Sequence, residues 1–381
     1  MKAHACERCG QRIFFENTRC ENCGATLGFD ADALRMRAFE VSAEGVWTSV
    51  AEAGDVPPLR PCANYVNQNV CNWLVAGDDP NPLCRSCRTT RVLPDLGKPE
   101  NRDYWGAIEA AKRRMVYSLL ALGLPLPGKG EDFEHGVAFE FLEELTPTFK
   151  VLTGHDDGVI TLNIAEADDA QRERLRHHLH EPARTLLGHF RHEIGHYYWD
   201  RLVRGTSWEE PFRALFGDER QDYAAALHAH YQSPKADWMS SFVSVYASSH
   251  PWEDWAECWA HYLHMLDGLE TAEAWGLELR DAVPGTPPVK ARALTPGSKH
   301  LERNLVQNWL PVSQFVNAMA RSLGAHDSYP FVVPTPVIDK LSFIHDVIRA
   351  AVRGEVPMNF TPAIPAEDPV PQTSTTEPSP A

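Results

Sequence analysis

Between residues 98 and 354 the hydrophobic positions repeat mostly with the period of an α-helix. Apolar side chains recur every three or four residues in five segments, which predicts helices over 103–122, 182–203, 251–267, 315–323 and 337–352. The segment 159–164 (VITLNI) is instead rich in β-branched residues and follows a glycine, so it predicts a strand. Because helices dominate and strands are few and early, the pattern favours an α+β fold.

The two ends of the chain have different patterns. Residues 1–95 are punctuated by Pro, Gly and Asn and contain eight of the nine cysteines. Residues 356–381 contain seven prolines among Thr, Ser and Glu, a composition that cannot pack a core and predicts a disordered tail. We therefore expect a cysteine-rich domain over 1–95, a mainly helical domain with a small sheet over 98–355, and a tail over 356–381.

Composition and charge exclude several classes of protein. With 381 residues, 43% hydrophobic and 23% charged, the chain is typical of a soluble globular protein of roughly two domains. No apolar run approaches the roughly 18 residues that cross a bilayer, and the N-terminus does not resemble a secretory signal. The formal charge of −16 disfavours a general binder of nucleic acid or anionic membrane. We expect a cytoplasmic protein with no membrane contact.

The first four cysteines have the spacing of a metal site. Cys6 and Cys9 form one C-x-x-C pair, Cys20 and Cys23 form a second, and a glycine follows each pair where a metal-binding turn needs a positive φ. This two-knuckle pattern predicts a zinc ribbon with a tetrahedral site of four thiolates. Iron in the same site is an alternative that spacing does not exclude, and disulfides or free thiols are another.

The next four cysteines, Cys62, Cys71, Cys84 and Cys87, are spaced less regularly, but the last two again form a C-x-x-C pair. We predict a second structural site of four thiolates and a small domain that depends on metal to fold. Residues 1–95 carry ten Lys and Arg against twelve Asp and Glu, which is not the footprint of a phosphate binder. A structural role, or docking of a protein partner, is therefore better supported than nucleic-acid binding.

The segment His192-Glu193-Ile194-Gly195-His196 carries the sharpest chemical signal. Two histidines four residues apart project from one face of a helix and can share a Zn²⁺, while Glu193 is placed to take a proton from the attacking water. Apolar residues around the motif indicate a buried helix. The alternative is a core helix whose histidines are satisfied by other partners.

A catalytic zinc needs a third protein ligand. In the metzincin pattern that ligand would fall at position 202, which is a leucine, so that class is excluded. The helix predicted over 251–267 carries Glu253 and Glu257 one turn apart on an apolar, tryptophan-rich helix. Because buried carboxylates are costly without a cation or hydrogen bonds, a zinc ion with its imidazoles would explain this pair.

The segments HFRHEIGHYYWD and YASSHPWEDWAECWAHYLHML resemble the gluzincin metallopeptidases. Nearly the whole chain except the tail is similar to bacterial zinc-binding metallopeptidases that carry an N-terminal zinc ribbon. The resemblance implies that Glu253 is the third zinc ligand, that Glu257 orients a ligating histidine and that Tyr246 stabilises the oxyanion. It also implies that 159–164 is the edge strand that binds extended peptide. A surface carboxylate at 257, a core aromatic at 246 and a strand that merely fills the sheet are the alternatives.

Two further polar residues lie near the predicted metal-binding face. Asp200 is a candidate acceptor for the proton of a ligating imidazole, or a solvated carboxylate, whereas His189 is expected to pack rather than bind metal. Together these features predict a zinc metallopeptidase with one catalytic and two structural zinc ions that acts on peptides or proteins. A non-catalytic adaptor and a zinc hydrolase of a non-peptide amide are the alternatives, and Glu193 argues against the adaptor because a scaffold needs only the metal ligands.

Overall fold

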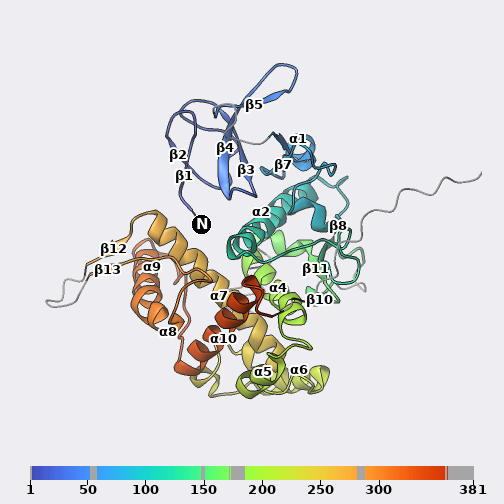
Figure 1. The fold of residues 1–381 in the computed structure, drawn as a ribbon. Coiled ribbons are helices and arrows are strands. Elements are labelled where there is room, and N and C mark those ends of the chain that lie inside the picture. Colours follow the sequence, from blue (N-terminus) through green and yellow to red (C-terminus); the bar gives the residue numbers. More distant parts are fainter. Residues whose placement is uncertain are drawn as a thin grey trace, which may run out of the picture.

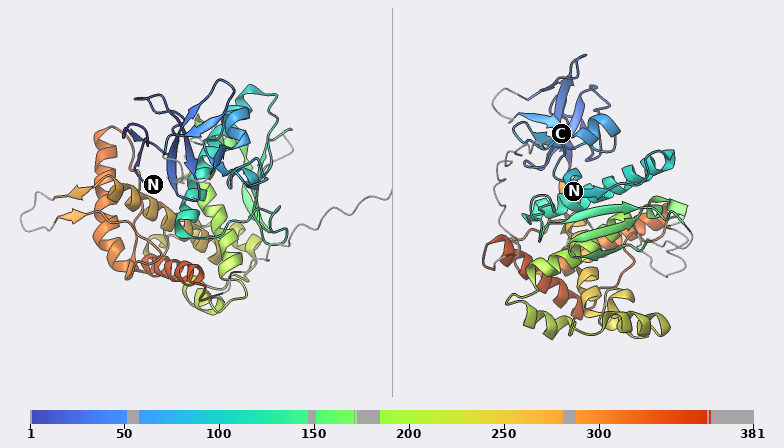
Figure 2. Two further views of the ribbon diagram at one scale, coloured as in Figure 1. Left: turned by 45° about the horizontal axis from the view of Figure 1, so that its top comes forward. Right: turned by 90° about the vertical axis from the view of Figure 1, so that its right-hand side faces the viewer.

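The computed structural model describes residues 2–51, 58–146, 151–170, 172, 185–280, 288–356 and 358. The cysteine-rich region forms one end of the molecule and rests on helix α2 (Pro99–Leu122), while α5 (Glu209–Phe216) and α6 (Tyr223–Gln232) lie at the opposite end (Figure 1; Figure 2). Apart from residues 356 and 358, the predicted tail lies outside the described residues. So does the predicted start of a helix at residue 182.

The cysteine-rich region is built from short antiparallel strands. These are β1 (His4–Ala5) with β2 (Arg12–Ile13), β3 (Thr26–Asp30) with β4 (Arg35–Val41) and β5 (Trp47–Ser49), and β6 (Leu59–Pro61) with β7 (Leu74–Ala76), plus helix α1 (Ala63–Gln68). Phe15, Phe29 and Trp73 are buried together, with ring centroids 4.8 Å apart for the first pair and 4.9 Å for the second. Because these rings come from both halves of the region, the two groups of cysteines share one core.

The rest of the chain is mainly helical, as the hydrophobic pattern predicts. All five predicted helices are present as α2, α4 (Leu186–Leu202), α7 (Pro251–Ala274), α9 (Leu310–Ser322) and α10 (Thr335–Val352). The described residues also contain α5, α6 and α8 (Leu301–Asn304), the π-helix η5 (Leu305–Trp309), the 3-10 helices η1 (Cys87–Thr89), η2 (Ile164–Ala167), η3 (Trp238–Ser240) and η4 (Tyr246–Ser248), and a hairpin of β12 (Glu278–Leu279) and β13 (Val289–Lys290). The predicted α+β class is confirmed.

A mixed four-stranded sheet accompanies these helices. Its order is β10 (Gly154–Asp156), β11 (Val159–Asn163), β9 (Ala138–Leu142) and β8 (Thr90–Val92), with only the β10–β11 pair antiparallel. The expectation that 159–164 forms the edge strand is wrong, because β11 is paired on both sides and the outer strands are β10 and β8. Strand β8 joins this sheet although it lies within the predicted 1–95 domain, whose boundaries stay a prediction.

Helices α4 and α7 approach each other closely at Gly195. A Cβ at this position would lie 3.1 Å from the Cα of Ala256 and 3.1 Å from the Cβ of Trp259, and the Trp255 indole donates to the Gly195 carbonyl at 2.9 Å. Glycine is unfavourable in a helix interior, so its presence is explained by this close approach. The contact fixes the distance between the two helices that carry the predicted zinc ligands.

Gly195→Ala is therefore expected to destabilise the fold, although alanine has the higher helix propensity by about 1 kcal/mol. Overpacking a core costs typically about 1–3 kcal/mol, so after the gain in helix propensity we expect a net loss of up to about 2 kcal/mol in a denaturant melt. Gly106→Ala is the matched control, because its Cβ would meet only Val70 at an ordinary 3.7 Å. If both variants were equally stable, close packing at Gly195 would not be limiting.

The cysteine-rich region packs on both α2 and the C-terminal end of α7. On the α7 side, the Phe14 ring stacks on Trp275 and Arg12 lies 4.1 Å from the centre of the same indole ring. On the α2 side, the buried Arg113 donates to the Val70 carbonyl at 2.6 Å. In the described part of the chain, no helix has the length and apolar character needed to cross a membrane.

Candidate metal centre

The cysteines form two separate clusters of four. In the first, Cys6 and Cys23 have their sulfurs 3.7 Å apart, and those of Cys9 and Cys20 are 3.6 Å apart. These distances exclude disulfides, whose sulfurs are about 2.05 Å apart. A tetrahedron with Zn–S bonds of about 2.3 Å has edges of about 3.8 Å, so the cluster fits a zinc ion. The glycines after both pairs, Gly10 and Gly24, have φ of 72° and 74°, as predicted.

The second cluster joins Cys62, Cys71, Cys84 and Cys87, all of them buried. The sulfurs of Cys71 and Cys84 are 3.8 Å apart, and backbone amides donate to three of the sulfurs, as at metal-bound thiolates. The guanidinium of Arg113 on α2 is also buried; burial lowers its pKa, but negative charge on Cys71 and Glu109 outweighs this and raises it. The set of four sulfur donors fits a dication held by thiolates.

The third cluster lies between α4 and α7. Thr185 caps α4 by accepting from the Gly188 amide, and His192 and His196 lie on successive turns of the helix. The Nε2 atoms of the two histidines are 3.2 Å apart, and the Glu253 Oε2 is 2.9 Å from the first and 3.4 Å from the second. The predicted ligand atoms are thus brought together from two helices.

These distances fit a zinc ion. Zn–N and Zn–O bonds of about 2.0–2.1 Å give a tetrahedron with edges of about 3.3 Å, close to the three observed separations. Burial alone would lower the pKa of His192, but hydrogen bonds to Glu253 and Glu257 outweigh it and raise the pKa well above its ordinary value. The two carboxylates therefore favour positive charge at this position.

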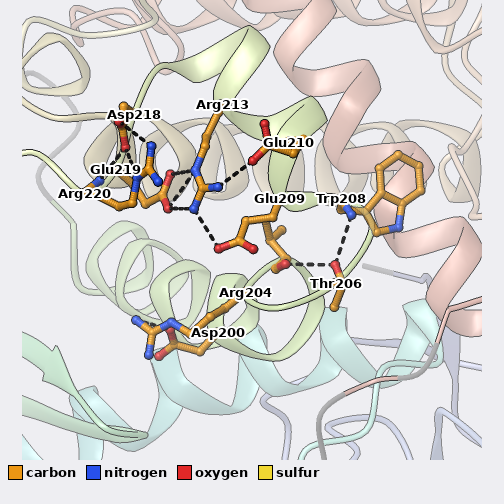
Figure 3. Close-up of polar contacts among 11 residues, drawn as sticks. Asp200, Arg204, Thr206, Trp208, Glu209, Glu210, Arg213, Asp218, Glu219 and Arg220 are labelled. Atoms are coloured by element: carbon orange, nitrogen blue, oxygen red, sulfur yellow. Dashed lines mark hydrogen bonds and ion pairs between the residues drawn. The ribbon is translucent and has the colours of Figure 1, made fainter.

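A hydrogen-bonded chain holds the His192 ring in place. Its Nδ1 is 2.8 Å from the Glu257 Oε1, and the Ser244 hydroxyl donates to the other oxygen of that carboxylate at 2.6 Å. Glu257 is therefore in the position that the resemblance implies. Asp200, in contrast, pairs with Arg204 at 2.9 Å (Figure 3), and the His196 Nδ1 has no hydrogen-bond partner among the described residues. The structure does not bring Asp200 to a ligating imidazole.

The two predicted catalytic residues both adjoin the cluster. Glu193, next to His192 in the sequence, is buried, and desolvation raises the pKa of its carboxyl toward neutral pH. The Tyr246 ring centroid is 5.9 Å from that of His192, and burial raises the pKa of its phenol well above the ordinary value. His189, expected to pack or to support the site rather than bind metal, is not among the clustered ligand atoms, and its Nδ1 contacts the carboxylate of the buried Glu166 on η2.

Three residues at the cluster were not singled out from the sequence. The Tyr223 hydroxyl on α6 donates to the Glu253 Oε1 at 2.6 Å. The Trp252 ring packs against the His196 ring at a tilt of 37° with centroids 3.7 Å apart, and the His155 ring on β10 lies 6.3 Å from the His196 ring. Burial lowers the pKa of His155 to about 3, so this imidazole is neutral. Trp252 adjoins a predicted ligand and could have been noticed, whereas no local motif marks Tyr223 or His155.

Comparisons with known proteins agree with this geometry. Residues 101–347 match the family described as "Putative zinc-binding metallo-peptidase", and residues 3–98 match a family described as "zinc-ribbon domain". Two relatives from Mycobacterium tuberculosis and one from Mycobacterium bovis, each named "Uncharacterized protein", are 42% identical over 365 residues, which is 95% of this chain and 98% of each relative. No solved structure matches. The chain therefore belongs to this family of zinc-binding metallo-peptidases with an N-terminal zinc ribbon.

Proposed function

We propose that this protein is a zinc-dependent metallopeptidase that hydrolyses peptide bonds. The observation that carries the proposal is the convergence of His192, His196 and Glu253 around one point, with the buried Glu193 on the same helix. Two imidazoles and one carboxylate leave a fourth position free, as in catalytic rather than structural zinc sites. The two clusters of four cysteines would hold structural zinc, which gives three zinc ions per chain.

Each residue around the site has a distinct role in the proposed reaction. A zinc ion held here would polarise the attacking water and the substrate carbonyl. Glu193 accepts a proton from that water and passes it to the leaving amine nitrogen. Glu257 fixes the His192 ring through its Nδ1, and Tyr246 donates a hydrogen bond to the oxygen on which negative charge develops.

The edge strand β10 is the proposed site for the substrate backbone. Strand β10 is paired with β11 along one edge, and its other edge has no strand partner among the described residues. His155, in the middle of β10, lies beside His196 and Trp252. An extended peptide that adds to a sheet edge gains main-chain hydrogen bonds in a fixed register. Such a peptide would run along the side of the sheet that adjoins the two predicted zinc-binding histidines.

A cleavage screen tests the proposal directly. The protein with its zinc complement is incubated with a broad peptide library, and products are identified by mass spectrometry. We expect cleavage that a chelator abolishes and added zinc restores. If a protein shown to hold three zinc ions cleaved no peptide, the non-peptide hydrolase and the non-catalytic adaptor would replace this proposal.

Tyr246→Phe is expected to reduce kcat by about 10²–10³-fold while leaving zinc content and fold intact, because one oxyanion donor is removed. Steady-state kinetics and a thermal melt of the same sample measure this. A tyrosine that only packs would give the opposite result: a lower Tm and an unchanged kcat per folded molecule.

A further inference from the structure

Glu253 presents its two carboxylate oxygens to different partners. Oε2 faces the Nε2 atoms of His192 and His196, whereas Oε1 accepts the hydrogen bond from Tyr223 at 2.6 Å. The Glu253 side chain is almost completely buried, at 1% exposure, so water does not compete for either oxygen. The orientation of this carboxylate is therefore set by three protein groups, and only Tyr223 among them donates to Oε1.

Tyr223 does not owe its position to packing of its own helix. Helix α6 has no buried residue along its length, and its first turn is capped by the Asp222 side chain, which accepts from the Ala225 amide. The Tyr223 ring instead contacts His250 and Trp252, with centroids 5.2 and 6.0 Å away. These two residues flank Pro251 at the start of α7, immediately before Glu253.

The loop that precedes Tyr223 is tied down from two sides. Arg213 on α5 forms a two-pronged pair with Glu219, at 3.0 Å and 2.6 Å, and is also held by Glu209 and Glu210 (Figure 3). On the other side, the Gln221 carbonyl is 3.4 Å from the His250 Nε2. The loop over 217–222 therefore delivers Tyr223 to the site in a fixed orientation although α6 itself is exposed.

We propose that Tyr223 is a positioning residue of the metal centre, whose hydroxyl holds one oxygen of Glu253 so that only the other oxygen faces the two imidazoles. The inference rests on the proposed function, since it assumes that these three side chains hold zinc. Hydrogen-bond partners of metal ligands fix ligand orientation, and their loss typically weakens metal affinity by about 10–100-fold.

The test measures zinc affinity rather than activity. Zinc-loaded wild-type protein and Tyr223→Phe are titrated with a chelator while the zinc that remains bound is quantified. We expect Tyr223→Phe to release the most weakly held zinc with a Kd about 10–100-fold higher than wild type. With Co²⁺ at this site, its visible absorption spectrum should also change, because Glu253 is free to rotate. The two cysteine clusters keep their zinc throughout.

Matched variants separate this role from a general effect on structure. Tyr231→Phe, on the same helix but 65% exposed, should leave the Kd unchanged, and Tyr246→Phe should also bind zinc like wild type. Glu219→Gln, which weakens the loop anchor, should raise the Kd in the same direction by a smaller factor. A wild-type Kd and Co²⁺ spectrum for a folded Tyr223→Phe would overturn the inference. Absence of a third zinc from the wild-type protein would instead overturn the proposed function.

Discussion

Glu193→Gln is expected to keep three zinc ions and to lose peptide hydrolysis by about 10²–10⁴-fold. Glutamine has the shape of glutamate, but its amide accepts no proton from the attacking water. The stability of the fold should not fall, because burial raises the pKa of Glu193 and the carboxylate therefore carries a desolvation penalty that the neutral amide avoids. Rate constants, elemental analysis and a thermal melt of one preparation measure all three effects.

Glu302→Gln is the control for this experiment. Its side chain is exposed on α8 and belongs to none of the three clusters, so activity and zinc content should match wild type. A general base contributes at least about 10²-fold to the rate. If Glu193→Gln retained more than about a tenth of the wild-type rate, the loss would be too small for a general base, and another group would have to move the proton.

The parts of the site that the sequence predicts are those set by local geometry. His192 and His196 face the same point because one helical turn separates them, and each C-x-x-C pair folds around its own glycine turn. Such patterns are determined within five residues of chain. Glu253 and Glu257 needed a further argument, since the sequence alone does not say which other helix lies against α4.

The parts that the sequence does not predict depend on tertiary pairing. The edge strand β10 is only three residues long (Gly-His-Asp) and has no hydrophobic alternation, so the more regular β11 was expected at the edge. Asp200 has the right helical spacing to approach His196, but its carboxylate forms an ion pair with Arg204, one turn further along the chain. Tyr223 reaches Glu253 through a loop whose course no local pattern determines.

The C-terminal end of α7 is a further feature that depends on tertiary contacts and that the sequence does not predict. The sequence predicts an end near Asp267, yet α7 continues to Ala274. In this extension Leu269 and Ala272 are buried, while Asp267 and Glu270 accept hydrogen bonds from Ser118 and Tyr117 of α2. Polar and apolar contacts together therefore hold the helix beyond its predicted end.

This extra length joins the two functional regions of the molecule. Helix α7 carries Glu253 in its first turn and ends beside Trp275, which packs against Phe14 and Arg12 of the zinc ribbon. Helix α2 makes the second connection through Arg113, next to the second cysteine cluster. The cysteine-rich region therefore rests on α7, which carries Glu253, and on α2, which packs against α4, the helix that carries His192 and His196.

Glu253→Ala is expected to reduce the zinc content from three ions to two and to abolish peptide hydrolysis. The remaining histidines offer two ligands, one fewer than the three protein ligands of a catalytic zinc. The change also removes the anion that raises the pKa of His192, and that faces the ring at 2.9 Å. Elemental analysis after gel filtration in zinc-free buffer measures the loss.

Glu257→Gln provides a graded comparison, because it contacts His192 on the opposite ring nitrogen. It should keep the third zinc at saturating concentration but bind it about 10–100-fold more weakly. The two variants thus separate a ligand from an orienting residue: loss of the ligand abolishes zinc binding at the site, whereas loss of the orienting residue only weakens it. Three zinc ions retained by Glu253→Ala would contradict the assignment, since the convergence of Oε2 with two imidazoles would then have no role in binding metal.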